Sequence, residues 1–120
     1  MKKILIVDDE PNIVMALEYT FKKNNYEVFI ARDGQEALDI VKTSFPDLII
    51  LDVMMPMVDG YATLEQIRKD SNLKHTKVIF LSAKNKESDI EKGILLGADA
   101  YLTKPFSIKK VVEQVSELLS

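Results

Sequence analysis

Five side chains that can do chemistry follow short apolar runs of this sequence. Asp8 and Asp9 follow ILIV, Asp52 follows LIIL, Ser82 follows VIFL, and Lys104 follows AYLT. Carboxylates that lie close together raise one another's pKa unless a cation lies between them. Mg²⁺ is a hard cation held by carboxylates, carbonyls and water, and a lysine ammonium pairs with carboxylates or with phosphoryl oxygens. These residue types therefore predict a divalent-metal site that handles an anionic group.

Each of these residues also has an ordinary structural explanation. Two acids after a strand often form a turn that caps a helix, a serine can do the same, and a loop lysine is usually solvated. Pro105 follows Lys104, and a cis bond before proline, the only common place for one, would point Lys104 inward. If the apolar runs are strands that end at one edge of the same sheet, coincidence is a poor explanation for all five residues.

The apolar runs are predicted to be parallel β-strands separated by amphipathic helices. The runs cover residues 4–7, 28–30, 48–51, 78–81 and 100–102. Pro11 suits a first helical turn, Asp33 and Ser107 are expected to cap helices, and residues 86–96 form another helix. Five strand–helix repeats predict right-handed crossovers, and strands that are apolar on successive residues need helices on both faces. The expected fold is α/β, a three-layer α/β/α sandwich of the flavodoxin-like (βα)5 kind. Ligands of such sheets bind at the carboxyl ends of the strands.

The composition is that of one globular domain covering residues 1–120. The chain has 47% hydrophobic and 29% charged residues, a net charge of −3 and no cysteine. It lacks a basic stripe for nucleic acid or membranes, and without cysteine it forms no disulfide or thiolate metal site. The N-terminal apolar run is too short for a signal peptide, and no stretch approaches the roughly 20 apolar residues of a spanning helix. We expect a cytoplasmic protein, either free-standing or part of a longer chain.

Four segments resemble the receiver domains of two-component response regulators, the fold exemplified by the chemotaxis regulator. The segments are ILIVDDE, DLIILDVMMPMVDG, VIFLSA and GADAYLTKPF, and the resemblance covers the whole chain. It implies the strand order 2-1-3-4-5 and makes Asp52 the phosphoacceptor. It also implies Mg²⁺, with Mn²⁺ as an alternative, bound by Asp9 and Asp52, by Asp8 mainly through water, and by the backbone carbonyl of Met54.

The same resemblance implies a switch that passes phosphorylation on as a change of shape. Ser82 would hydrogen-bond to the phosphoryl group, Lys104 would pair with it, and the orientation of Tyr101 would report the switch. The relay face would comprise the helix 86–96, the strand 100–102 and the last helix. The implied partners are a histidine kinase or phosphotransfer protein and a downstream protein or fused output domain. The chain would not be an enzyme beyond its own phosphorylation and dephosphorylation.

Two other functions are weighed against the switch. A small phosphatase with an aspartyl phosphate intermediate usually carries a second acid two residues past the nucleophile, but that position is Met54. An interaction module that works without phosphorylation would have no need for three acids, a hydroxyl and a lysine together. Many related receivers dimerise through charge pairs on the relay face. This chain disfavours that dimer because it has Leu95, Ala100, Gln114 and Ser116 at those positions.

The remaining expectations concern packing. The helix 86–96 is predicted to bury a stripe of Ile90, Gly93, Ile94 and Gly97. Leu95 lies off that stripe, and with Leu96 it could anchor a partner. The side chains of methionines 54, 55 and 57 are expected to serve packing, with only the Met54 carbonyl taking part in chemistry. The only histidine, at position 75, is expected to be solvated.

Overall fold

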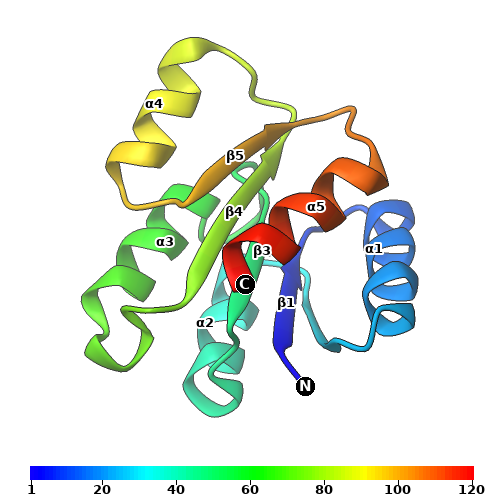
Figure 1. Ribbon diagram of the computed structural model, residues 1–120. Coiled ribbons are helices and arrows are strands. Elements are labelled where there is room, and N and C mark those ends of the chain that lie inside the picture. The colour runs from blue at the N-terminus through cyan, green and yellow to red at the C-terminus, as the bar shows by residue number, and fades with distance from the viewer.

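Strands and helices alternate along the whole chain in the computed structural model, which describes residues 1–120. The strands are β1 Lys3–Val7, β2 Glu27–Ala31, β3 Leu48–Leu51, β4 Lys77–Ser82 and β5 Ala100–Thr103. The α-helices are α1 Pro11–Lys23, α2 Gly34–Ser44, α3 Gly60–Lys69, α4 Glu87–Leu95 and α5 Ile108–Leu119 (Figure 1). A short 3₁₀ turn over Ser71–Leu73, which the sequence pattern did not predict, precedes β4. None of the helices combines the length and the apolar character that crossing a membrane requires.

The five strands form one parallel sheet in the order β2-β1-β3-β4-β5, as predicted. The register aligns the ends of the central strands, because Val7 pairs with Leu51 and Leu51 pairs with Phe80. The residues that follow these strands therefore emerge side by side at one edge of the sheet. This edge is where parallel α/β sheets bind their ligands.

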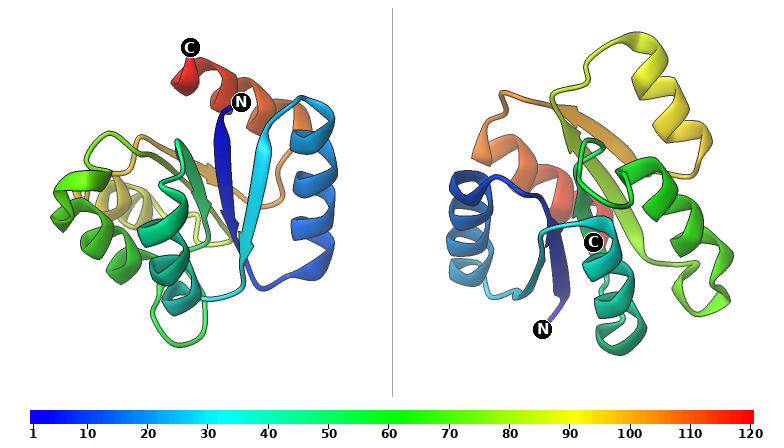
Figure 2. Two further views of the ribbon diagram at one scale, coloured as in Figure 1. Left: turned by 90° about the horizontal axis from the view of Figure 1, so that it is seen from below. Right: turned by 180° about the vertical axis from the view of Figure 1, so that it is seen from behind.

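Helices cover both faces of the sheet, which confirms the three-layer arrangement. In the left view of Figure 2, α1 and α5 lie on one side of the sheet, and α2, α3 and α4 lie on the other. One core combines residues of α2 and α3 with one face of the strands, and a second core combines α1 and α5 with the other face. All four residues of β3 are buried, since neighbouring residues point into different cores.

Short polar side chains cap the N-termini of helices at the predicted positions. Asp33 accepts a hydrogen bond from the Glu36 N–H at 2.8 Å, and Ser107 accepts one from the Lys110 N–H at 3.0 Å. These bonds satisfy N–H groups that have no partner inside the helix. Pro11 is the first residue of α1, where its missing N–H removes no helical bond.

Two packing predictions are wrong, and both fail outside the regular strands. Ile94 is 47% exposed, because α4 meets the sheet through the close approach of Gly93, its only buried residue. Met54 and Met57 are 56% and 82% exposed, since they lie in the loop beyond the end of β3, and Met55 alone packs against the core. Leu96, beside the exposed Leu95, is partly buried and packs against the core.

Candidate functional site

Asp8 and Asp52 lie next to each other at the carboxyl ends of β1 and β3. The Asp52 N–H donates to the Val7 carbonyl at 3.0 Å, which continues the pairing of the two strands by one residue. Asp8 is 3% exposed and Asp52 is 4% exposed, so both carboxylates have lost most of their water. The Met54 N–H donates to Asp52 Oδ1 at 3.1 Å and orients this carboxylate further.

Lys104 places its ammonium between three carboxylates. Its Nζ lies 3.0 Å from Asp8 Oδ2, 3.1 Å from Asp52 Oδ2 and 3.1 Å from Glu10 Oε1. An ammonium has three N–H donors, so these three contacts use its full capacity. Burial alone would lower the pKa of Lys104, but the hydrogen bonds to Asp8, Asp52 and Glu10 outweigh burial and raise it. The Lys104–Pro105 bond is cis, as anticipated, and the side chain points into the cluster.

Opposing effects act on the pKa of Asp8 in this cluster. Burial raises the pKa of Asp8 above its ordinary value near 3.8, although the Glu10 N–H and Lys104 both act to lower it. The charged form of Asp8 is therefore less favourable in the folded protein than in water, even beside an ammonium. The cluster holds negative charge at a cost to folding.

The third carboxylate of this cluster is Glu10, where Asp9 was expected. Oxygen atoms of Asp8, Glu10 and Asp52 all lie within 4.8 Å of one another, which suits a hard divalent cation. Asp9 is exposed and lines a neighbouring cavity of about 540 Å³ together with Met54. Glu10 is the third acid of the DDE motif, but the sequence pattern does not indicate which of Asp9 and Glu10 faces Lys104.

Ser82 and Tyr101 meet at the segment that leads into α4. Ser82 is fully buried, and its Oγ accepts a hydrogen bond from the Lys84 N–H at 3.3 Å. The Tyr101 hydroxyl donates to the carbonyl of the same residue, Lys84, at 2.7 Å. Burial raises the pKa of Tyr101 above its ordinary range, so its hydroxyl remains a donor. One residue thus connects the hydroxyl at the end of β4 with the aromatic ring on β5.

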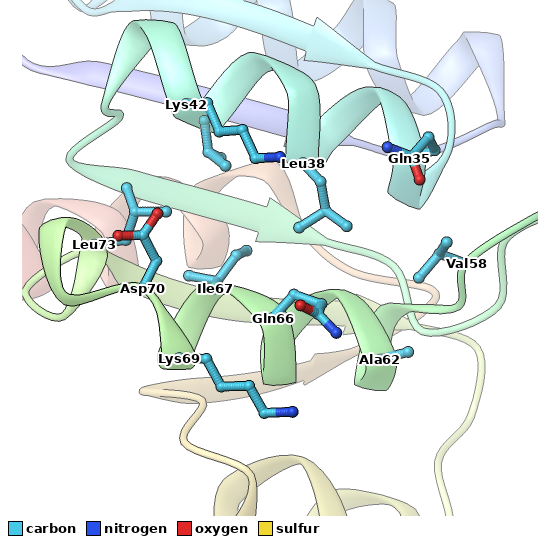
Figure 3. Close-up of a pocket in the computed structure, with 11 residues that line it drawn as sticks. Gln35, Leu38, Lys42, Val58, Ala62, Gln66, Ile67, Lys69, Asp70 and Leu73 are labelled. Carbon is cyan, nitrogen blue, oxygen red and sulfur yellow. The ribbon is translucent and has the colours of Figure 1, made fainter.

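A separate cavity of about 550 Å³ lies between α2 and α3. Figure 3 shows it between the two helices, with Leu38 and Ile67 facing each other across it and Lys42 at its rim. None of the carboxylates that contact Lys104 lines it. Its size therefore does not make it the chemical site, because the charged groups gather at the sheet edge.

The family model for the response regulator receiver domain matches residues 4–116 of this chain. The chain belongs to this family. It is therefore a receiver domain of a two-component response regulator.

Individual relatives agree with this assignment. The alkaline phosphatase synthesis transcriptional regulatory protein PhoP of Bacillus subtilis is 45% identical over 118 residues, which are 98% of this chain and 48% of that protein. The receiver domain of Francisella response regulator 1452 has a TM-score of 0.91 and 38% identity, covering 98% of this chain and 96% of that one. Chemotaxis response regulator CheY4 of Vibrio cholerae has a TM-score of 0.92 and 31% identity, covering 98% of both chains. The receiver domain spans about half the length of the curated relatives it matches.

Replacing Asp8 by asparagine should make this receiver domain more stable. Because the pKa of Asp8 is raised, the folded state binds a proton more readily than the unfolded state. The contribution of Asp8 to stability is thus complete at pH values below its ordinary pKa and is lost as the pH rises through the raised one. A permanently neutral asparagine avoids that loss. We expect a gain of about 1 kcal/mol at pH 7, a common size for a single stabilising substitution.

Urea unfolding of Asp8→Asn and wild type at pH 7 and pH 3.5 measures this gain. The difference between the two proteins should shrink at pH 3.5, where wild-type Asp8 is protonated. Asp39→Asn, on the exposed side of α2, is the matched control and should change little. An Asp8→Asn protein less stable than wild type at pH 7 would contradict the account of the cluster.

Proposed function

We propose that this receiver domain is a phosphorylation-activated switch that accepts a phosphoryl group on Asp52. The donor would be a histidine kinase, a phosphotransfer protein or a small phosphodonor. The observation that carries the proposal is the meeting of the Asp8, Asp52 and Lys104 side chains at the carboxyl ends of separate strands. A nearly buried carboxylate held between an amide N–H and an ammonium has little freedom, which favours reaction with a bound donor.

The chemistry is an exchange of one bond to phosphorus for another. An Asp52 oxygen forms a bond to phosphorus as the bond between phosphorus and the donor's nitrogen or oxygen breaks, and the donor leaves with that electron pair. The product is an aspartyl phosphate. Lys104 would exchange its contact with Asp52 Oδ2 for a phosphoryl oxygen and offset the added charge. Ser82 would leave the Lys84 N–H and donate to the phosphoryl group.

The oxygen atoms at this edge fit a divalent metal. We assign Asp8, Asp9, Asp52 and the Met54 carbonyl to Mg²⁺ or Mn²⁺, with Glu10 as a further carboxylate in reach of the same place. The bound ion would neutralise charge on the oxygens of the transferring group. The ammonium of Lys104 supports this assignment, because it lies among the Asp8, Glu10 and Asp52 oxygens and a cation is favourable there.

The relay would start at Lys84, because this residue contacts both Ser82 and Tyr101. Loss of the Ser82 contact frees the segment before α4, and Tyr101 then adjusts with it. The face formed by α4, β5 and α5 would carry this change to a downstream protein or a fused output domain. Leu95, 87% exposed on α4, would anchor that partner. Phosphorylation would shift the population of the domain between two existing conformations.

Other features of the proposal follow from the same residues. The domain would catalyse only its own phosphorylation and dephosphorylation, since Met54 supplies no acid or base for turnover. It would work in the cytoplasm, where phosphodonors are made, without binding nucleic acid itself. A homodimer based on charge pairs is disfavoured by Leu95, Ala100, Gln114 and Ser116.

Incubation with acetyl phosphate and Mg²⁺ tests the function. Intact-mass measurement of the wild type should show the gain of one phosphoryl group. Asp52→Asn should show none, because an amide oxygen is a far weaker nucleophile than a carboxylate. Asp39→Asn serves as the control and should gain mass as the wild type does. Absence of any gain in the wild type, or an equal gain in Asp52→Asn, would refute the proposal.

A further inference from the structure

The N-terminal part of α4 is held to the rest of the domain by two tyrosine hydroxyls. Tyr101 of β5 donates to the Lys84 carbonyl at 2.7 Å, just before the helix, and Tyr61 of α3 donates to the Asp89 carbonyl at 3.0 Å, in its first turn. Gly93 is the only buried residue of α4. A helix with so little buried surface depends more than usual on individual polar contacts for its position.

Tyr61 is built into the layer beneath α4. It is 7% exposed, and its ring and that of Phe80 form a T-shaped pair with 5.5 Å between centroids. Phe80 in turn lies 5.7 Å from the ring of Tyr101, so the three aromatic residues are continuous. On the outer side, Lys92 Nζ of α4 lies 4.5 Å from the Tyr61 ring centroid. Burial raises the pKa of Tyr61, and the hydroxyl therefore stays protonated as a donor.

The chain just after α4 is held more firmly, at Gly97, and by the same helix α3. Arg68 donates to the Gly97 carbonyl from Nε at 3.1 Å and from Nη2 at 2.9 Å. It also donates to the Thr76 carbonyl at 2.8 Å and to Asp99 Oδ2 at 3.1 Å. Bonds from a charged donor are worth roughly twice those of neutral groups. The end of α4 nearer Ser82 is thus the weaker attachment, and the end at Gly97 is the stronger one.

We propose that Tyr61 is a positioning residue of the relay, whose hydroxyl holds the first turn of α4 against α3 as a partner to Tyr101. This inference rests on the proposed switch, because it concerns how α4 responds. Movement of the Lys84 segment would open the helix from its N-terminal end, with Gly97 as the fixed end. The Tyr61 hydroxyl then sets how readily that opening occurs.

Amide hydrogen exchange of the Tyr61→Phe variant of this domain, residues 1–120, tests the proposal. Phenylalanine keeps the ring and removes only the hydrogen bond, so amides over residues 86–91 should exchange roughly 3- to 10-fold faster. Amides near Gly97 should not change. Tyr19→Phe is the matched control, because Tyr19 is 68% exposed on α1, and its exchange should equal that of the wild type.

A second measurement separates a role in the relay from general stabilisation. If both hydrogen bonds break in one opening of α4, the effects of Tyr61→Phe and Tyr101→Phe on the free energy of that opening should add. Over residues 86–91 the double variant should then exchange faster than the wild type by about the product of the two single-variant factors. A double variant that exchanges no faster than the more affected single variant, unchanged exchange at residues 86–91, or equally faster exchange throughout the protein would each overturn the proposal.

Phosphoryl uptake from acetyl phosphate distinguishes this inference from the proposed function. Tyr61 makes no contact with the Lys104 cluster, so Tyr61→Phe should still gain one phosphoryl group. A wild type that takes up no phosphate contradicts the function itself. A wild type that does, paired with a Tyr61→Phe protein whose α4 exchanges normally, contradicts only the role of Tyr61.

Discussion

Replacing Lys104 by methionine should lower the free energy of unfolding by about 3 kcal/mol and slow phosphoryl uptake roughly 100-fold. The Lys104 side chain is 10% exposed, and the side chains of its partners Asp8 and Asp52 alone are 3% and 5% exposed. Methionine fills similar space but leaves two buried negative charges without a cation. Breaking a buried pair by removing one partner is costly for this reason, whereas an exposed pair contributes little.

The loss should depend on pH in a definite direction. Lys104 acts to lower the pKa of Asp8, so its removal raises that pKa further. The folded variant then binds protons more tightly than the unfolded chain, and its stability increases as the pH falls. The raised pKa of Lys104 itself means that its stabilisation in the wild type is complete below its ordinary pKa of 10.5. The gap between the two proteins should therefore be widest near pH 8 and narrower near pH 4.

Urea unfolding at both pH values, with a chelator present so that no metal replaces the ammonium, measures the gap. Intact mass after brief exposure to acetyl phosphate and Mg²⁺ measures uptake. Lys109→Met is the matched control, since Lys109 is 87% exposed and lies 4.0 Å from Glu113. A Lys104→Met protein as stable as the Lys109→Met protein at pH 8 would mean that the cluster does not need its cation.

The strands and the edge they share were predictable because they depend on local pattern. A buried parallel strand needs four or five successive apolar residues, and its end is marked by the first charge, as at Asp8 and Asp52. Once two such strands are neighbours, the register alone brings these acids together. Lys104 was predictable for the same reason, since it follows β5.

The other features of the site and of α4 depend on tertiary contacts that the periodicity of the sequence does not encode. Glu10 and Asp9 are adjacent acids, and which one turns toward Lys104 is decided by the path of the chain into α1. Ile94 lies on the expected stripe of α4, but that helix approaches the sheet through one glycine and leaves the isoleucine uncovered. No sequence pattern singles out Tyr61, because only the position of α4 gives its hydroxyl an acceptor.

Replacing Gly60 by alanine should destabilise the domain by about 3 kcal/mol and impair phosphoryl uptake. Gly60 begins α3, and a Cβ there would lie 2.3 Å from the Asp52 carbonyl oxygen and 2.7 Å from the Val53 Cα. Both are backbone atoms, so relief requires moving the chain that carries the phosphoacceptor. Displacement of a reacting group by about 1 Å can cost roughly 100-fold in rate.

Two effects oppose each other at Gly60, and their sizes decide the outcome. Alanine is favoured over glycine inside a helix by about 1 kcal/mol, which alone would stabilise the variant. The overlap with the Asp52 and Val53 backbone is larger, because moving Gly60 away from these atoms also strains the 2.8 Å bond from the Gly60 N–H to the Val53 carbonyl. Glu65→Ala, at an exposed position of the same helix, is the control and should leave stability and uptake nearly unchanged. If urea unfolding finds Gly60→Ala as stable as wild type, with normal phosphoryl uptake, then the contact between α3 and Asp52 does not position the phosphoacceptor.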